Sequence, residues 1–355
     1  MSSTSGTGLR RERVKSSKQF DGKTFKNPTG LGPGLKGNPL PLIGEYFFGT
    51  NQRMPPGPLP LLKPHEDWGR KPDAGLRATW LGHSTVLLEL DGFRVLTDPV
   101  FGERASPLPF AGPKRFHPTP SSLDELPELD AVLLSHDHYD HLCRYTMLAL
   151  AKKTMPIVTS LGVGQHLENI GIAPQRIHEL DWGESVDIKG VRFTAEPCQH
   201  FSGRGLSDRN STLWASYVIQ TANRKVFFSG DTGLTEQYKD IGARHGKFDL
   251  VMLEVGAWHE SWGAIHLGPA NALTAFEWLG GGTLFPVHWG TFNLALHDWD
   301  EPAETLIKLA GDQKKRIITP RIGQVFVPER IDGATPWWRE VVKASAPSGQ
   351  PAVSR

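Results

Sequence analysis

The chain has 355 residues, a formal net charge of +1 and two cysteines. A charge this close to zero argues against nucleic acid as the main partner, because proteins that bind nucleic acid usually carry a basic excess. The sequence contains no run of eighteen apolar residues and no apolar segment near its start, so we expect neither a transmembrane helix nor a secretory signal. Two cysteines do not build a disulfide framework, which favours the reducing cytoplasm.

The first 64 residues are predicted to form an N-terminal arm that is partly disordered. Residues 1–26 are polar and expected to be poorly ordered, whereas residues 27–64 are rich in Gly and Pro, which block long regular elements. An apolar patch at residues 41–48 either packs over the core, the favoured interpretation, or faces lipid. A short basic run is typical of a solvated tail, with attraction to anionic lipid as the alternative. Its residues are Arg10, Arg11, Arg13, Lys15 and Lys18.

From residue 76 the sequence becomes rich in β-formers, beginning with strands predicted at 76–81, 86–90 and 94–97. Asp91-Gly92 between the last two is a strong hairpin signal. Further strands are predicted at 131–135, 156–160, 185–188, 191–196, 213–220, 225–229, 249–254, 283–287, 316–319 and 324–327. Helices are predicted at 144–152, 161–170, 235–245, 269–279 and 301–311.

Two rounds of strands followed by helices predict an α/β protein with two packed sheets and helices outside. We expect residues 65–330 to form this single domain. Residues 331–355 are expected to be a tail that is partly disordered, because residues 341–355 are rich in Ala, Ser and Pro.

The strongest motif is the run from His136 to His141, which reads H-x-H-x-D-H and directly follows the apolar strand at 131–135. Imidazole nitrogen and carboxylate oxygen are the ligands that zinc and similar divalent metals prefer. Four such side chains in one short loop exceed what a single metal needs from one loop. The motif therefore indicates a centre with more than one metal.

Three more predicted strands end in a residue that can bind a metal. Gln199-His200 follows strand 191–196, Gly230-Asp231 follows strand 225–229, and His288-Trp289-Gly290 follows strand 283–287. Loops at strand ends are common places for sites because a rigid sheet holds them. Two metals about 3.5–4 Å apart usually need a bridging carboxylate and further ligands, which these positions offer.

The order of these motifs resembles the metallo-β-lactamase superfamily. Within it, several segments resemble the N-acyl-phosphatidylethanolamine-hydrolysing phospholipase D family, over roughly residues 65–328. They are Trp80-Leu81-Gly82-His83-Ser84-Thr85, Leu96-Thr97-Asp98-Pro99, Arg104-Ala105-Ser106-Pro107, Gly112-Pro113-Lys114-Arg115-Phe116 and His288-Trp289-Gly290-Thr291-Phe292. The resemblance implies an αββα sandwich of two mixed sheets with helices on the outer faces.

The resemblance also implies a ligand set. It places His136, His138 and His200 on one metal. It places Asp140, His141 and His288 on the other, with Asp231 as the bridge. Two divalent ions are expected, with zinc favoured, although nitrogen and oxygen ligands also suit iron or manganese. Asp98 matches a buried carboxylate that orients a metal-binding histidine.

Further roles around this centre are predicted with their alternatives. With the resemblance, Asp140, Asp231 and His266 are the expected catalytic residues, and His266 matches a family histidine at the substrate end of the site. His266 would contact the substrate phosphate or assist the leaving group, and a polar surface residue is the alternative. His83 is expected near the site, where a structural hydrogen bond with the backbone is favoured. Trp258 and Trp289 are predicted to bind substrate by lining a groove for acyl chains, with simple burial as the alternative.

The predicted function is hydrolysis of N-acyl-phosphatidylethanolamine-like glycerophospholipids by a hydroxide held between two metals. A lactonase, or an amide or phosphoester hydrolase of a small soluble substrate, is the alternative. A scaffold without activity is disfavoured by the complete ligand set. We expect a lipid or small ester as partner and no nucleic acid. A peripheral membrane contact and a homodimer are both compatible with the sequence.

Overall fold

The computed structural model describes residues 5–30, 44–45, 48–70, 75–331 and 333–345. Within these residues, a seven-stranded sheet has the order β13-β1-β2-β3-β4-β5-β6. Its strands are β1 (Leu76–Gly82), β2 (Thr85–Leu90), β3 (Phe93–Thr97), β4 (Ala131–Leu134), β5 (Ile157–Ser160), β6 (Ile177–Leu180) and β13 (Val325–Phe326). A six-stranded sheet has the order β12-β11-β10-β9-β8-β7. Its strands are β7 (Ser185–Ile188), β8 (Val191–Glu196), β9 (Ser216–Gln220), β10 (Lys225–Phe228), β11 (Leu250–Glu254) and β12 (Thr283–Val287).

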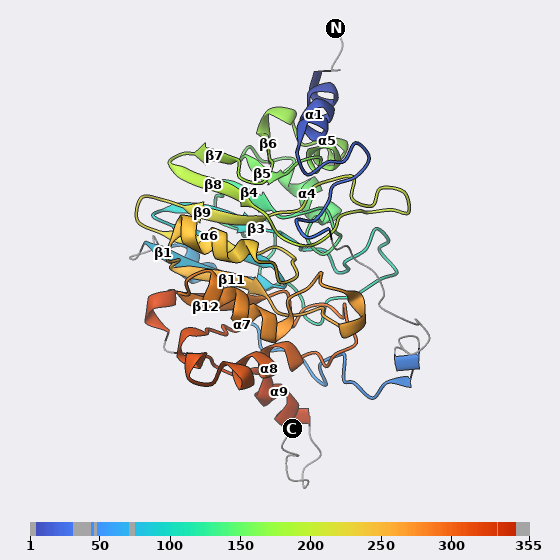
Figure 1. Cartoon of the computed structure of the whole chain (residues 1–355). Coiled ribbons are helices and arrows are strands. Elements are labelled where there is room, and N and C mark those ends of the chain that lie inside the picture. Colours follow the sequence, from blue (N-terminus) through green and yellow to red (C-terminus); the bar gives the residue numbers. More distant parts are fainter. Residues whose placement is uncertain (1–4, 31–43, 46–47, 71–74, 332, 346–355) are drawn as a thin grey trace.

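Helices cover the outer faces of the two sheets (Figure 1). Their bounds are α1 (Ser5–Ser16), α3 (His65–Trp68), α4 (Arg144–Leu150), α5 (Gly164–Ile170), α6 (Gln237–His245), α7 (Gly268–Trp278), α8 (Glu301–Ala310) and α9 (Trp338–Ser345). Helices α6 and α7 pack on the six-stranded sheet, and α4 and α5 pack on the seven-stranded sheet. The predicted αββα sandwich is confirmed.

Strand β4 shows how the sequence produces this layering. Ala131 and Leu133 lie in the core between the two sheets, whereas Val132 and Leu134 pack under α4 and α5. Successive side chains of a strand point to opposite faces, so a strand with both faces covered must be apolar throughout. The uninterrupted run Ala131–Leu134 therefore places β4 in the middle of the sandwich, with its carboxyl end carrying the histidine-rich loop.

The hairpin predicted at Asp91-Gly92 is confirmed. Both residues have positive φ angles, 48° and 86°, and Leu90 of β2 pairs with Phe93 of β3. This is the two-residue turn in which both central residues need left-handed backbone, which explains the preference for Asp-Gly.

The structure differs from the predicted strands in two places. Residues 316–319 were expected to form a strand, but Ile317 makes only an isolated bridge with Leu284, and a 3₁₀ segment runs through Gly311–Arg316. Strand β6 was not predicted, because His178 and Glu179 interrupt its apolar pattern. Its position beside β5 depends on pairing, which a local pattern does not encode.

Both ends of the chain are more ordered than predicted. Residues 5–26 contain helix α1 and the fully buried Phe25, so the prediction of little order there is wrong. Residues 341–345, also expected to lack order, belong to α9, in which Trp338 and Val341 are buried. Each segment packs against elements remote in sequence, which composition does not reveal. Most of the apolar patch at 41–48 lies outside the described residues. Among the described helices, none is long and apolar enough to cross a membrane.

Replacing Phe227 with Ala should lower the free energy of unfolding by about 3–5 kcal/mol, because it leaves a cavity in the core. Phe227 is fully buried and its ring contacts the rings of Tyr238 and Phe248. Chemical denaturation followed by tryptophan fluorescence measures the change. Leu309→Ala is the control, because Leu309 is 52% exposed and should contribute less than about 0.5 kcal/mol. Equal unfolding midpoints for the two variants would contradict this core.

Candidate metal centre

Four strand ends meet at one edge of the sandwich. Strand β4 leads into the loop that carries the residues from His136 to His141. Strands β8, β10 and β12 of the other sheet lead to His200, Asp231 and His288. The candidate ligands therefore come from both sheets and meet where the carboxyl ends of these strands approach one another. A site in this position is held by two rigid elements at once.

The first cluster, called the His136 group, consists of His136, His138, His200 and Asp231. One potential ligand atom from each lies within 4.8 Å of the others. His138 Nδ1 is 2.9 Å from His136 Nε2 and 3.3 Å from His200 Nε2. Asp231 Oδ2 completes the cluster, 3.9 Å from His136 Nε2 and 3.7 Å from His200 Nε2. These are the residues that the family resemblance assigned to one metal and its bridge.

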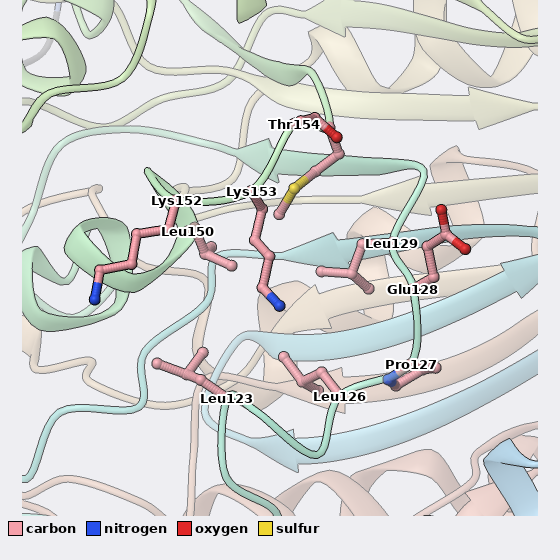
Figure 2. A pocket seen from close by; sticks show the side chains of 10 residues that line it. Leu123, Leu126, Pro127, Glu128, Leu129, Leu150, Lys152, Lys153 and Thr154 are labelled. Carbon is pink, nitrogen blue, oxygen red and sulfur yellow. The ribbon is translucent and has the colours of Figure 1, made fainter.

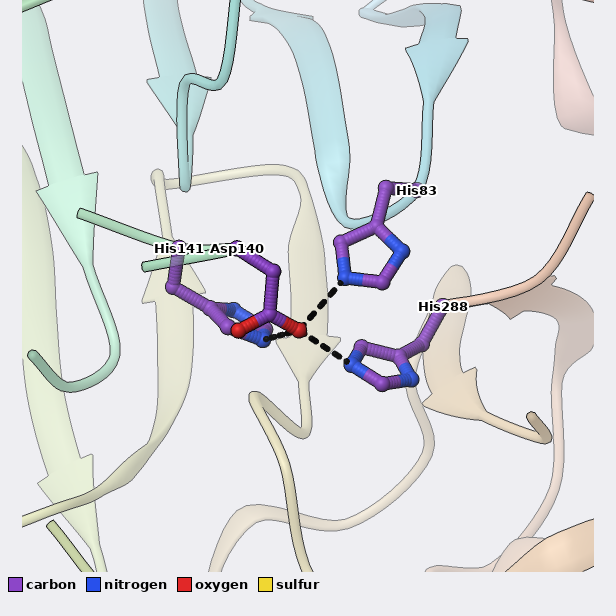
Figure 3. Close-up of side chains that lie close together, drawn as sticks. All are labelled: His83, Asp140, His141 and His288. Atoms are coloured by element: carbon purple, nitrogen blue, oxygen red, sulfur yellow. Dashed lines mark hydrogen bonds and ion pairs between the residues drawn. The ribbon is translucent and has the colours of Figure 1, made fainter. Parts of the chain in front are cut away.

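The second cluster, called the Asp140 group, consists of His83, Asp140, His141 and His288 (Figure 3). Asp140 Oδ2 lies 3.0 Å from His83 Nε2, 3.2 Å from His288 Nε2 and 3.4 Å from His141 Nε2. His83 was expected to be held mainly through a hydrogen bond with the backbone. Instead its side chain joins the predicted ligands through Asp140.

Asp231 connects the two groups. Its Oδ2 atom is 3.2 Å from His141 Nε2 and 3.1 Å from His288 Nε2, in addition to its place in the His136 group. The side chain is almost fully buried. One carboxylate oxygen thus faces nitrogen atoms of both groups, which is the arrangement that a bridging ligand requires.

The donor set fits divalent cations. Among the described residues, His141 Nε2 and Asp231 Oδ1 are buried without any hydrogen-bond partner. Buried polar atoms nearly always have a partner, so unpaired atoms within this cluster point to a group that would satisfy them. Imidazole and carboxylate at this density suit zinc, iron or manganese.

Hydrogen bonds on the far side of the rings fix how the histidines point. His141 Nδ1 lies 2.6 Å from Asp98 Oδ2, and a carboxylate only accepts, so this nitrogen donates and leaves Nε2 free for the site. Asp98 is fully buried and also accepts from the backbone N–H of Ser135 at 2.7 Å. His200 Nδ1 donates to the carbonyl of Ile265 at 2.9 Å.

His266 lies beside both groups and is held by a carboxylate that sequence reasoning missed. A ring nitrogen of His266 lies within 4.8 Å of ligand atoms of Asp231 and His288. Its Nδ1 atom is 3.1 Å from Oε1 of Glu254, a fully buried residue at the end of β11. The same oxygen accepts from the backbone N–H of Leu267 at 2.8 Å. The sequence did offer one signal for Glu254, because this carboxylate ends an otherwise apolar strand.

The two tryptophans predicted to bind substrate differ in their surroundings. Trp258 is partly exposed and lines a cavity of about 280 Å³ together with His266 and Trp262. Trp289 is 3% exposed, and its indole ring stacks on Trp80 and Trp337. Contact between the Trp289 ring and a substrate does not fit that burial, so we correct this prediction and assign the ring to core packing.

A second cavity has a volume of about 450 Å³, and Figure 2 shows side chains that line it. Its lining includes Leu129, which precedes β4, and Met155, which precedes β5. The candidate ligands follow β4 instead. This cavity is therefore at the opposite end of the strand and is not part of the candidate site.

A family model described as beta-lactamase superfamily domain matches residues 93–289, which include the histidine-rich loop, His200, Asp231 and His288. The chain belongs to the metallo-β-lactamase superfamily. It is accordingly a metal-dependent hydrolase, with histidine and aspartate clusters able to bind metals.

Individual proteins and solved structures are also similar to this chain. An uncharacterized protein of Mycobacterium tuberculosis is 46% identical over 303 residues, covering 84% of this chain and 80% of that protein. N-acyl-phosphatidylethanolamine-hydrolyzing phospholipase D 1 of Caenorhabditis elegans is 37% identical over 250 residues, covering 67% and 70%. The crystal structure of isothiocyanate hydrolase from Delia radicum gut bacteria has a TM-score of 0.58 at 22% identity, covering 71% of this chain and 98% of that one. That structure shares the fold.

Burial and neighbouring charges set the protonation of the candidate ligands in this site. Burial lowers the pKa of His136 and His200 well below the ordinary value, so both rings are neutral and keep a lone pair for a metal. Burial by itself would raise the pKa of Asp231, but the nearby His141 and His288 lower it well below its usual value. The His136 group thus presents an ionised carboxylate together with neutral imidazoles, which are the protonation states that a cation binds.

Zinc uptake at pH 7 should release protons from the protein. Burial lowers the pKa of His141 and His288, but the Asp231 and Asp140 carboxylates outweigh it, raising His141 well above its ordinary value and His288 to about 10. Both rings therefore carry protons that a cation must displace, so affinity should rise with pH. Isothermal titration calorimetry in buffers of different ionisation enthalpy counts these protons. Binding heats that do not depend on the buffer would contradict this assignment.

Proposed function

We propose that this protein is a di-metal phosphodiesterase of phospholipase D type that cleaves N-acyl-phosphatidylethanolamine or a similar glycerophospholipid. The observation that carries the proposal is the position of Asp231 Oδ2. This oxygen lies 3.1–3.9 Å from histidine Nε2 atoms of both ligand groups. Similarity to the Caenorhabditis elegans enzyme, 37% identical over 70% of that protein, supports the lipid substrate.

Each predicted ligand has a place in this proposal. His136, His138 and His200 would hold one cation, and Asp140, His141 and His288 the other, with Asp231 shared between them. When bound, two such cations, which we propose to be zinc, supply Lewis acidity and lower the pKa of a coordinated water toward neutrality. The remaining steps depend on how the protein's own side chains hold these residues and the substrate.

His83 would fix the orientation of Asp140. Burial lowers the pKa of His83 to about 3, so the ring is neutral and Nε2–H donates to Asp140 Oδ2 at 3.0 Å. A neutral His83 holds the Asp140 carboxylate in place by this hydrogen bond and leaves its negative charge intact. Burial by itself would raise the pKa of Asp140, but the nearby His141 and His288 keep it well below the usual value. Asp140 therefore remains ionised.

His266 is placed to act on the leaving group. Hydrolysis of the phosphodiester joins a water oxygen to phosphorus, breaks the bond to the N-acylethanolamine oxygen, and leaves that oxygen in need of a proton. Glu254 Oε1 accepts from Nδ1 of His266, so Nε2 is the ring nitrogen free to deliver this proton. The products would be phosphatidic acid and an N-acylethanolamine.

The cavity beside His266 supports an apolar substrate. Trp258, Trp262 and Leu234 line part of its volume of about 280 Å³, next to the proposed position of the leaving group. Ligand pockets that bind apolar molecules combine such aromatic walls with a few polar groups that fix orientation. We propose that this cavity receives part of the N-acyl chain.

Zinc-loaded protein in detergent micelles should convert N-acyl-phosphatidylethanolamine to phosphatidic acid and N-acylethanolamine, with both products identified by mass spectrometry. Asp231→Ala should abolish turnover while retaining the fold, because it removes the shared ligand. Asp187→Ala is the matched control, because Asp187 pairs only with Arg192 on an exposed strand in the described structure. No cleavage by folded, zinc-loaded protein would refute the lipid substrate. Cleavage of a lactone or small phosphoester would then identify the alternative.

His266→Gln should lower kcat by about 10²–10⁴-fold, the usual contribution of general acid–base catalysis. Zinc content, measured by inductively coupled plasma mass spectrometry, should remain that of the wild type, because His266 is not among the proposed ligands. A lipid analogue with a more acidic leaving-group alcohol should lose less rate, since it needs less help from a proton donor. Equal losses with both substrates would show that His266 does not protonate the leaving group.

A further inference from the structure

We infer that Asn27, in the N-terminal arm, is a positioning residue for His200, an inference that rests on the proposed metal centre. Asn27 Oδ1 accepts from the backbone N–H of His200 at 3.0 Å, and Asn27 Nδ2 donates to the carbonyl of His200 at 2.8 Å. One amide side chain thus holds both main-chain polar groups of a single candidate ligand. Asn27 is 8% exposed, and its Oδ1 also accepts from Trp214 Nε1 at 3.1 Å.

His200 needs this support because it lies beyond the sheet. Strand β8 ends at Glu196, and the residue before His200, Gln199, forms an isolated bridge with Gly233. An amide carries the same donor and acceptor as a peptide group, so Asn27 takes the place of a neighbouring strand at His200. Together with the bond from Nδ1 to Ile265, three contacts fix the backbone and ring of His200.

A buried aromatic residue anchors the segment that carries Asn27. The ring of Phe25 is fully buried in a cluster with Cys198 and Trp214, and its backbone N–H donates to the carbonyl of Asn210 at 2.8 Å. Thr29, two residues after Asn27, donates to the side chain of Gln199 at 2.5 Å. The arm therefore lies along the loop that leads to His200 on both sides of Asn27.

Helix α1 attaches the beginning of the arm through ion pairs. Arg10 pairs with Glu168 at 2.9 Å and with Glu179, whose side chain is 3% exposed. Arg13 pairs with Glu184. In Figure 1, α1 lies beside α5, the helix that contains Glu168. Two residues of the predicted basic run thus bind the hydrolase domain, which ties residues 5–30 to the metal centre.

Loss of Asn27 should weaken one metal site selectively. Removing a hydrogen-bond partner behind a metal ligand typically costs about 10–100-fold in metal affinity. Asn27 touches His200 but none of the Asp140 group in the described contacts. The zinc site formed by His136, His138 and His200 should therefore lose affinity while the other site keeps it.

The test is zinc titration of full-length wild type and Asn27→Ala against a chromophoric chelator, with the visible spectrum of the cobalt-substituted proteins as a second readout. We expect two zinc sites in the wild type and an affinity loss of about 10–100-fold at one of them in the variant. The cobalt spectrum should change for that site alone. Thr29→Val is the matched control, because it removes a bond from the same arm to Gln199 rather than to His200. Its affinities should equal those of the wild type.

Several results would overturn the inference. Equal zinc affinities in the wild type and Asn27→Ala, or equal losses at both sites, would show that Asn27 only stabilises the fold. If Asn27→Ala does not fold, Asn27→Asp retains the acceptor for His200 N–H and loses only the donor, and unchanged affinity in that variant would refute the inference. No lipid is present in these titrations. A wild type that binds two zinc ions but cleaves no lipid would therefore refute the proposed substrate and leave this result intact.

Discussion

The contacts of Asp231 Oδ2 with imidazole nitrogens from both sheets are the constraint on which the site depends. His141 from the loop after β4 and His288 from the loop after β12 approach this oxygen at 3.2 and 3.1 Å. A buried carboxylate is costly unless charged or hydrogen-bonding partners surround it. The two sheets must therefore pack in one relative position for Asp231 to be compensated, and that position also brings together the remaining candidate ligands.

Around this carboxylate, each supporting residue comes from a different part of the fold. Asp98, after β3, orients His141. Glu254, at the end of β11, orients His266. Asn27, from the N-terminal arm, holds the backbone of His200. Because these supports are separate, a change in one should affect its own histidine more than the whole centre, which makes the proposed roles separable by substitution.

The sequence revealed the parts of the site whose signal is local. The histidine-rich loop follows an apolar strand directly, and Asp231 and His288 each end a β-rich run, so these candidate ligands were visible as strand-end residues. The two-sheet fold followed from the order of strands and helices. Other contacts have no local signal, because Asn27 lies 173 residues before His200. Trp289 looked available for substrate until its packing against Trp80 was known.

His83 shows a different limit of prediction from sequence. It follows the bulged end of β1 with a φ angle of 54°, a left-handed conformation that is uncommon outside glycine. That backbone geometry directs the ring toward Asp140, whereas the sequence suggested only a residue near the site. Strained backbone of this kind tends to occur at functional sites, where surrounding contacts hold it in place. The direction of a side chain after a bulge depends on such contacts. The sequence around His83 therefore did not predict that its ring points toward Asp140.

The most direct test of the two-metal centre is anomalous X-ray diffraction at the zinc absorption edge, from crystals of the zinc-loaded protein. The account predicts two anomalous peaks about 3.5–4 Å apart, one in the His136 group and one in the Asp140 group, with Asp231 between them. A single peak, or a second peak that Asp231 does not reach, would contradict it.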